Sequence, residues 1–149
     1  METRKQAHSV YHCLYHIVWI TRYRHKVLVN NVIDYLSKKL LEVRKTYPEI
    51  IFIEKNIQPN HVHLVITFPP KYSISRIVQI LKSNTAKSVR NKFEFIQNRY
   101  RGGTGIWSTG YFVSTVGLDE ETIKAYVRYQ AKEDSGQAKL ALSVGRPRA

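Results

Sequence analysis

Apolar residues recur at two spacings along the chain, and these spacings separate predicted strands from predicted helices. Four runs are rich in β-branched and aromatic residues, as strands typically are: 11–21, 49–57, 61–68 and part of 106–117. Two segments repeat apolar residues every three or four positions, which predicts helices: 31 to about 47 and 73 to about 95. A last helix is predicted over 119–133, because its acidic first residues suit a helix N-terminus.

The predicted order of elements is β-α-β-β-α-β-α. Its first six elements match the split βαβ plan of ferredoxin-like folds, an antiparallel sheet covered on one face by two helices. The short connector at 58–60 favours an antiparallel hairpin between the second and third strands. We therefore predict an α+β fold in a single domain, 1–149, with an ordered core at about 11–133 and a loose C-terminal tail. The first and third strands are central in this plan.

The third predicted strand begins with two histidines, His61 and His63, separated by Val62. Side chains in a strand repeat every two residues, so both imidazoles point to one face and come within reach of one divalent ion. Two ligands are too few for a stable metal site, and a third must come from elsewhere. Histidines at this spacing also occur in strands as packing residues, so the motif by itself leaves both interpretations open.

The last predicted helix carries Tyr126 and Gln130 one turn apart on the same face. A tyrosine near a metal-binding amide would put a nucleophile beside a Lewis acid. The same face also contains Ile123 and Val127, so the pattern taken by itself favours ordinary core packing.

The charge of the chain favours an anionic partner. Lys and Arg number 24 against 11 Asp and Glu, a formal net charge of +13. Polyphosphates reward such a surface through counterion release, which points to nucleic acid. A membrane surface is the rival partner, but no segment pairs a broad apolar face with a dense basic one. The single cysteine, Cys13, excludes a disulfide framework or a CxxC zinc cluster. With no apolar run of about 18 residues and no signal-peptide pattern, we expect a soluble intracellular protein.

Basic and aromatic residues alternate in two predicted loops, "TRYRHK" at 21–26 and "RYRGG" at 99–103. Cations neutralise phosphates while aromatic rings stack on exposed bases, a combination suited to single strands and hairpin loops. Further cations follow the second long helix. The resulting candidates for DNA contact are Arg22, Tyr23, Arg24, Lys26, Lys82, Lys87 and Arg90.

Four segments in this order resemble the single-tyrosine transposases of bacterial and archaeal insertion sequences, which belong to the His-hydrophobic-His nuclease class. The segments are "YHIVWITRYRHKVL", "NHVHLVITFPP", "IWSTGYFVSTVG" and "YVRYQ". The resemblance extends from residue 11 to about 131 and includes a Tyr-x-x-x-Gln sequence in the last helix.

The resemblance implies a specific reaction. Tyr126 would attack a phosphodiester of single-stranded DNA, leaving a 5′-phosphotyrosine and a free 3′-OH. His61, His63 and Gln130 would hold one Mg²⁺ or Mn²⁺ ion. The expected ligands are DNA hairpins at the ends of the element, and the expected assembly is a homodimer acting in the cytoplasm at the nucleoid. Tyr129 is the rival nucleophile, but only Tyr126 fits the Tyr-x-x-x-Gln spacing.

Two other functions remain open at the level of sequence. The split βαβ sheet also occurs in RNA-binding domains, so the chain could be a non-catalytic module for single-stranded nucleic acid, or a domesticated relative that binds repeated palindromic DNA. A replication initiator or conjugative relaxase of the same nuclease class is the third alternative. Those proteins are commonly larger, and many use a third histidine or a glutamate as ligand.

Overall fold

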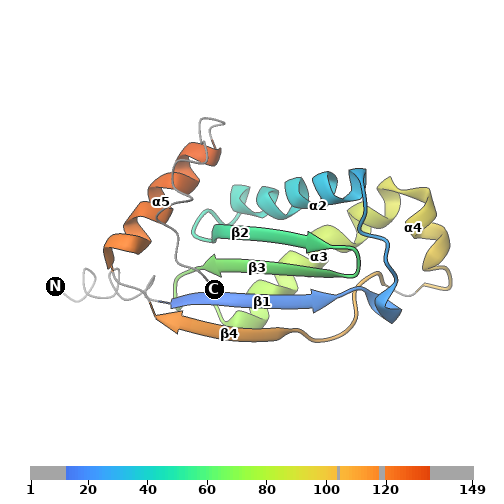
Figure 1. Ribbon diagram of the computed structural model, residues 1–149, viewed down its shortest axis with the longest axis horizontal. Coiled ribbons are helices and arrows are strands. Elements are labelled where there is room, and N and C mark those ends of the chain that lie inside the picture. Colours follow the sequence, from blue (N-terminus) through green and yellow to red (C-terminus); the bar gives the residue numbers. More distant parts are fainter. Residues whose placement is uncertain (1–12, 104, 118–119, 135–149) are drawn as a thin grey trace.

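The computed structural model describes residues 13–103, 105–117 and 120–134 (Figure 1). Its strands are β1 (Cys13–Ile20), β2 (Ile51–Gln58), β3 (His61–Thr67) and β4 (Phe112–Gly117). Its α-helices are α2 (Asn31–Glu42), α3 (Ile74–Lys92), α4 (Glu94–Arg99) and α5 (Glu120–Asp134), with 3₁₀ turns η1 (Arg22–Arg24) and η2 (Val43–Lys45). None of these helices is long and apolar enough to cross a membrane. The predicted loose tail lies outside the described residues.

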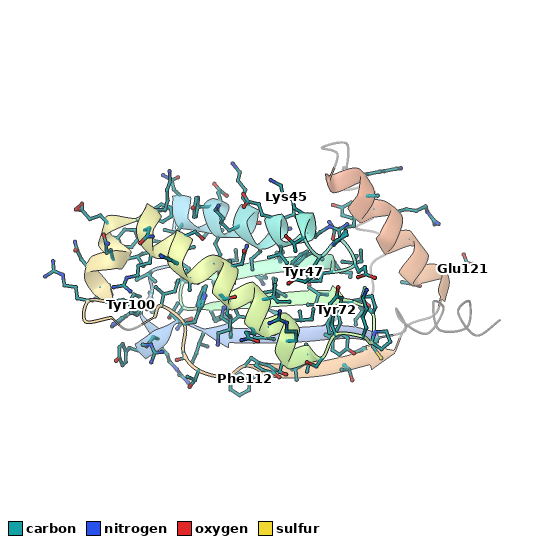
Figure 2. The ribbon with its side chains drawn as sticks, turned by 180° about the vertical axis from the view of Figure 1, so that it is seen from behind. Lys45, Tyr47, Tyr72, Tyr100, Phe112 and Glu121 are labelled. Carbon is teal, nitrogen blue, oxygen red and sulfur yellow. The ribbon has the colours of Figure 1, made fainter. Side chains whose placement is uncertain are left out.

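The strands form one antiparallel sheet in the order β2-β3-β1-β4. The predicted α+β class is therefore confirmed, and β1 and β3 are the central strands as expected. Figure 1 views the sheet from its open face, and Figure 2 shows α2 and α3 crossing the opposite face. One side of the sheet packs on α2 and α3. The other carries a small separate cluster of buried residues, Leu14, Ile51, Ile53 and Val65, and is more open at its His61 end.

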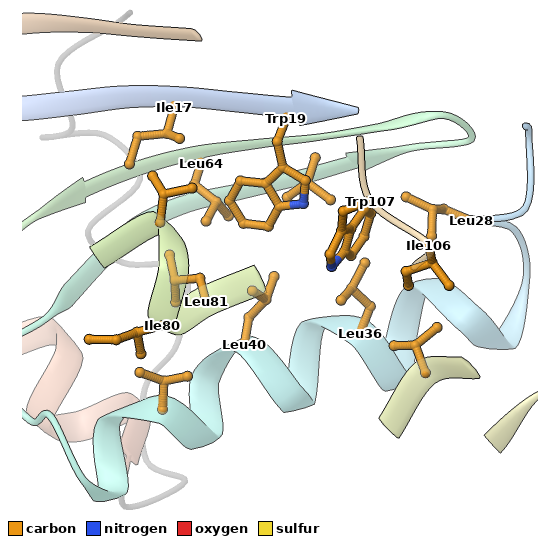
Figure 3. Close-up of a cluster of buried hydrophobic side chains, with 14 of the residues drawn as sticks. Ile17, Trp19, Leu28, Leu36, Leu40, Leu64, Ile80, Leu81, Ile106 and Trp107 are labelled. Atoms are coloured by element: carbon orange, nitrogen blue, oxygen red, sulfur yellow. The ribbon is translucent and has the colours of Figure 1, made fainter. Parts of the chain in front are cut away.

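The main core lies between the sheet and helices α2 and α3 (Figure 3). Alternate residues of β3, Val62 and Leu64, are fully buried in it, as is Ile17 of β1. The indole of Trp19 meets that of Trp107 edge to face, with ring centroids 5.8 Å apart. This period of two sends the intervening residues of β1 and β3 to the open face.

The two long predicted helices end earlier in the structure than in the sequence pattern, α2 at Glu42 and α3 at Lys92, and the fourth strand fills only the second half of 106–117. The helix predicted to about residue 95 breaks at Phe93, whose extended backbone (φ −118°, ψ 110°) separates α3 from α4. The fourth strand begins only at Phe112, although Trp107 before it already forms an isolated antiparallel bridge with Thr21. Trp107 is buried there, and its Nε1–H donates to Thr85 Oγ1 at 3.1 Å.

Lys82 of α3 holds the segment that leads into β4. Its Nζ donates to the carbonyl oxygens of Ser108, at 2.7 Å, and Gly110, at 3.1 Å. Partial burial, with a smaller effect from the nearby Arg22 guanidinium, lowers the pKa of Lys82 below its usual value. The ammonium group of Lys82 is therefore engaged in hydrogen bonds with the backbone of its own chain.

Replacing Lys82 by methionine should keep the aliphatic stem but leave both carbonyls without their donor. We expect the free energy of unfolding to fall by about 1 kcal/mol, and amide exchange at 108–111 to accelerate. Lys87→Met, at an exposed position of the same helix, is the matched control and should change stability by less than about 0.5 kcal/mol. Equal effects of the two substitutions, measured by urea denaturation and hydrogen exchange, would contradict this role for Lys82.

Candidate functional site

His61 and His63 lie side by side on the open face of the central strand β3. Each is partly buried, while Val62 between them points into the core. His63 pairs with Val18 of β1 on one side and with Asn56 of β2 on the other. The predicted common orientation of the two imidazoles therefore follows from the observed register of a strand that has neighbours on both sides.

A neighbouring amide fixes the tautomer of His61. Its Nδ1 lies 2.9 Å from Oδ1 of Asn60. An amide oxygen can only accept a hydrogen bond, so Nδ1 is the donor, and in the neutral ring the lone pair then lies on Nε2. This is the arrangement in which histidines bind metal ions, with the second ring nitrogen held by a hydrogen-bond acceptor.

A third histidine, His16 of β1, approaches the pair. Its ring centroid lies 6.0 Å from that of His63, with the ring planes at 40°. Burial, followed by the proximity of His63, lowers the pKa of His16, while the carboxylate of Glu54 opposes that shift. Sequence reasoning left His16 unassigned. Its alternation with Leu14 and Val18 already predicted its face, but only the register of β1 against β3 brings it to His63.

Gln130 is fully buried at the other end of the sheet. Its Oε1 accepts a hydrogen bond from the backbone N–H of Phe52 in β2. Phe52 pairs with Ile66, three residues beyond His63 on β3, which is about 10 Å along a strand. Figure 1 shows the same separation, with α5 at the end of the sheet opposite the β2–β3 turn. Within one chain, Gln130 and the histidine pair are not brought together.

Tyr126 belongs to the same helix, one turn before Gln130. Its side chain lies outside the described residues, so its prediction as nucleophile stays a prediction. The rival Tyr129 is partly buried.

The donor set on the open face fits two of the three ligands expected for a divalent ion. His61 and His63 offer imidazole nitrogens on one face, and imidazole is the side chain that most often binds metal ions in proteins. Among the residues that the structure describes, no three histidine, cysteine, aspartate or glutamate side chains converge on one point.

The basic turn after β1 lies at the histidine end of the sheet. The N–H of Thr21 donates to the carbonyl of Asn60, which directly precedes His61, at 3.0 Å. Tyr23, Arg24 and Lys26 are exposed there. Arg22 is partly buried, and its Nε donates to the carbonyl of Gly105 at 3.0 Å. The turn thus presents cations and an aromatic ring next to the histidine pair.

The cations predicted on α3 differ in their surroundings. Lys87 is exposed, Arg90 is partly buried, and Lys82 donates to two backbone carbonyls as described above. The helix covers the face of the sheet opposite to the histidines. Lys82 nevertheless lies near the Arg22 guanidinium of the basic turn.

Comparison with known proteins identifies the family of this chain. The model of the family "Transposase IS200 like" matches residues 9–130. The transposase of the insertion sequence IS200 from Salmonella typhimurium is 26% identical over 144 residues, covering 95% of this chain and 91% of its own. The ISDra2 transposase TnpA from Deinococcus radiodurans is 30% identical over 132 residues, covering 87% of this chain and 92% of its own.

Solved structures agree with the sequence comparison. A crystal structure of a candidate transposase from Deinococcus radiodurans R1 superimposes with a TM-score of 0.62 at 27% identity, over 87% of this chain and 93% of its own. A REP-associated tyrosine transposase bound to a REP hairpin has the same fold, with a TM-score of 0.54 at 14% identity, over 87% and 72%. Taken with the match over residues 9–130, these likenesses show that the chain belongs to the IS200-like transposase family of insertion sequences.

Proposed function

We propose that this protein cuts and rejoins single-stranded DNA at the hairpin-flanked ends of its insertion sequence, with Tyr126 as the nucleophile. The observation that carries the proposal is the position of His61 and His63. They lie together on the open face of the central strand, and an exposed basic and aromatic turn adjoins them. A pair of metal-binding side chains next to a surface for nucleic acid suits phosphodiester chemistry better than packing alone.

The reaction would exchange one phosphodiester for another. The phenol oxygen of Tyr126 attacks phosphorus while the bond to the 3′ oxygen breaks, and that oxygen leaves with a proton as a free 3′-OH. The DNA end stays on the enzyme as a 5′-phosphotyrosine, so another 3′-OH can reverse the step without ATP. A tyrosine has an ordinary pKa of roughly 10, so a neighbouring positive charge is needed to favour its phenolate near neutral pH.

His61, His63 and Gln130 are the residues proposed to hold a Mg²⁺ or Mn²⁺ ion. Such an ion, when bound, supplies positive charge to the oxygens of the scissile phosphate. Two features of the chain support the histidines in this role: their common orientation and the hydrogen bond from His61 Nδ1 to Asn60, which leaves Nε2 free to bind.

A homodimer is the assembly that we propose for this chemistry. Gln130 lies about 10 Å along the sheet from the histidines of its own chain, so a second copy is a reasonable source of the missing ligand and of Tyr126. The edge strand β4 could pair with a partner, because Phe112, Val113 and Val116 are 70%, 43% and 46% exposed. Joining two element ends also requires two nucleophiles.

The proposed substrate is a single-stranded DNA hairpin with an unpaired flank. The net charge of +13 supports binding to phosphates. A protein of the same fold has been solved with a REP hairpin, which supports a hairpin ligand for this chain also. We infer that the reaction takes place in the cytoplasm, where chromosomal DNA becomes single-stranded during replication.

Replacing Tyr126 by phenylalanine should abolish the covalent protein–DNA adduct while leaving affinity for the hairpin within about twofold, because only one oxygen is lost. The measurement is denaturing gel electrophoresis of protein incubated with labelled hairpin DNA and Mn²⁺.

Tyr129→Phe is the matched control and should still form the adduct. Adding EDTA before the DNA should prevent the unmodified protein from forming it. An adduct that survives in Tyr126→Phe but disappears in Tyr129→Phe would refute the assignment. Hairpin binding without any adduct from the unmodified protein would favour a non-catalytic binding module instead.

If the histidines of one chain act with Tyr126 of the other, two variants that are inactive alone should form the adduct when they are combined in one dimer. Tyr126→Phe keeps its histidines, and a His61→Ala/His63→Ala variant keeps its tyrosine. Co-expression should recover about a quarter of the normal adduct, since about half of the dimers are mixed and each of those holds one intact site. Tags of different mass should place the DNA on the variant that lacks the histidines. No recovery from mixed dimers purified through both tags would show that each chain completes its own site.

A further inference from the structure

Two consecutive residues of the turn after β1 adopt left-handed backbone conformations. Tyr23 has φ 60° and ψ 14°, and Arg24 has φ 55°. Neither is glycine, and residues with a Cβ atom occupy this region only at a cost in conformational energy. Such strain persists where the surrounding structure enforces it, and it is concentrated at functional sites.

Hydrogen bonds from several parts of the chain enforce this conformation. The hydroxyl of Thr21 donates to the carbonyl of His25 at 2.8 Å and the N–H of Arg24 to the carbonyl of Thr21 at 3.0 Å, which closes the turn. The N–H of Arg22 donates to the carbonyl of Ile106 at 2.7 Å, and its carbonyl accepts from the Tyr100 hydroxyl at 2.9 Å. The turn is therefore a fixed feature of the fold.

The ring of Tyr23 makes few packing contacts that could offset the conformational energy of its backbone. It is 66% exposed, and the ring contact recorded for it is with His25, at a centroid distance of 5.7 Å. His25 in turn contacts Tyr100 at 5.3 Å, and Tyr100 is buried. The result is a supported aromatic ring that projects from the surface.

The position of this ring relates it to the histidine pair. Ile20, the last residue of β1, is paired with His61, and the N–H of Thr21 donates to the carbonyl of Asn60. The turn thus begins one residue from the strand position that faces His61. Arg24 and Lys26 are exposed on the same turn and supply positive charge.

We propose that Tyr23 is a stacking site for one unpaired nucleobase close to the scissile phosphate, with Arg24 and Lys26 neutralising the neighbouring phosphates. This inference rests on the proposed function and assigns a substrate-positioning site within it. Bases in a duplex already stack on one another, so an exposed ring selects an unpaired nucleotide. Glycine would form the same turn without strain, and the presence of tyrosine is explained by what its ring binds.

The decisive variant is Tyr23→Gly, compared with Tyr23→Phe. Glycine removes the ring and the strain together, so the midpoint of thermal unfolding should stay equal or rise while affinity for the hairpin with its unpaired flank falls about tenfold or more. Tyr23→Phe keeps a ring and should bind within about threefold of the unmodified protein. The probe is the single-stranded hairpin and flank taken from DNA bordering the gene, measured by fluorescence anisotropy.

A protein–DNA double-mutant cycle identifies the base. A single abasic site is moved through the unpaired flank, and each oligonucleotide is titrated with the unmodified protein and with Tyr23→Gly. If Tyr23 stacks on one base, an abasic site at that base weakens binding to the unmodified protein about tenfold. The same abasic site leaves the affinity of the Tyr23→Gly protein unchanged. Phe95→Ala, which removes an exposed ring on α4, should leave the abasic profile of the unmodified protein intact.

The stacking site would be overturned if, at every position of the flank, an abasic site reduced the affinity of the unmodified protein and of Tyr23→Gly by the same factor. A Tyr23→Gly protein that binds the hairpin normally would also overturn it. Because these titrations measure binding rather than cleavage, they remain decisive if no covalent adduct forms. An adduct from the unmodified protein together with equal losses of this kind would reject the stacking site and leave the proposed function standing.

Discussion

The antiparallel pairing of β1 with β3 is the interaction on which the remainder of the structure depends. It buries Ile17 and Trp19 of one strand against Val62 and Leu64 of the other beneath α2 and α3. Because the side chains alternate, the same pairing sends His16, His61 and His63 to the open face. A shift of one residue in this register would put the histidines into the core and the apolar residues into water. The core and the candidate site are thus fixed by one set of backbone hydrogen bonds.

Several chain segments that surround this site lie next to one another at one end of the sheet. Thr21 is buried there and connects three of them: its N–H donates to Asn60, its hydroxyl donates to His25, and it forms an isolated bridge with Trp107. Residues far apart in sequence are held together at this point, and this explains how the turn can keep Tyr23 and Arg24 in left-handed conformations. The contacts that stabilise the fold at this end therefore also hold the exposed ring of Tyr23 in place.

The opposite end of the sheet is occupied by α5. The Gln130 amide binds the backbone of the edge strand β2 at Phe52, where the β2–β3 register shifts between Phe52 and Glu54. The other edge, β4, is exposed along its length. A single chain therefore keeps its last helix away from its histidines and leaves an edge for pairing, two features that suit a site shared between copies.

The order of the strands and long helices, the central place of β1 and β3 and the common face of His61 and His63 follow from the sequence alone, because periods of two and of about 3.6 reflect local backbone geometry. The His61–His63 pair and the Tyr126–Gln130 spacing were also visible there, together with the family resemblance they carry. Tertiary structure decided the rest. The meeting of His16 with His63 required a strand register, the break at Phe93 interrupted a continuous helical spacing of apolar residues, and the partner of Gln130 depended on where α5 docks. Contacts between distant segments depend on how whole elements pack, and no local pattern of residues encodes them.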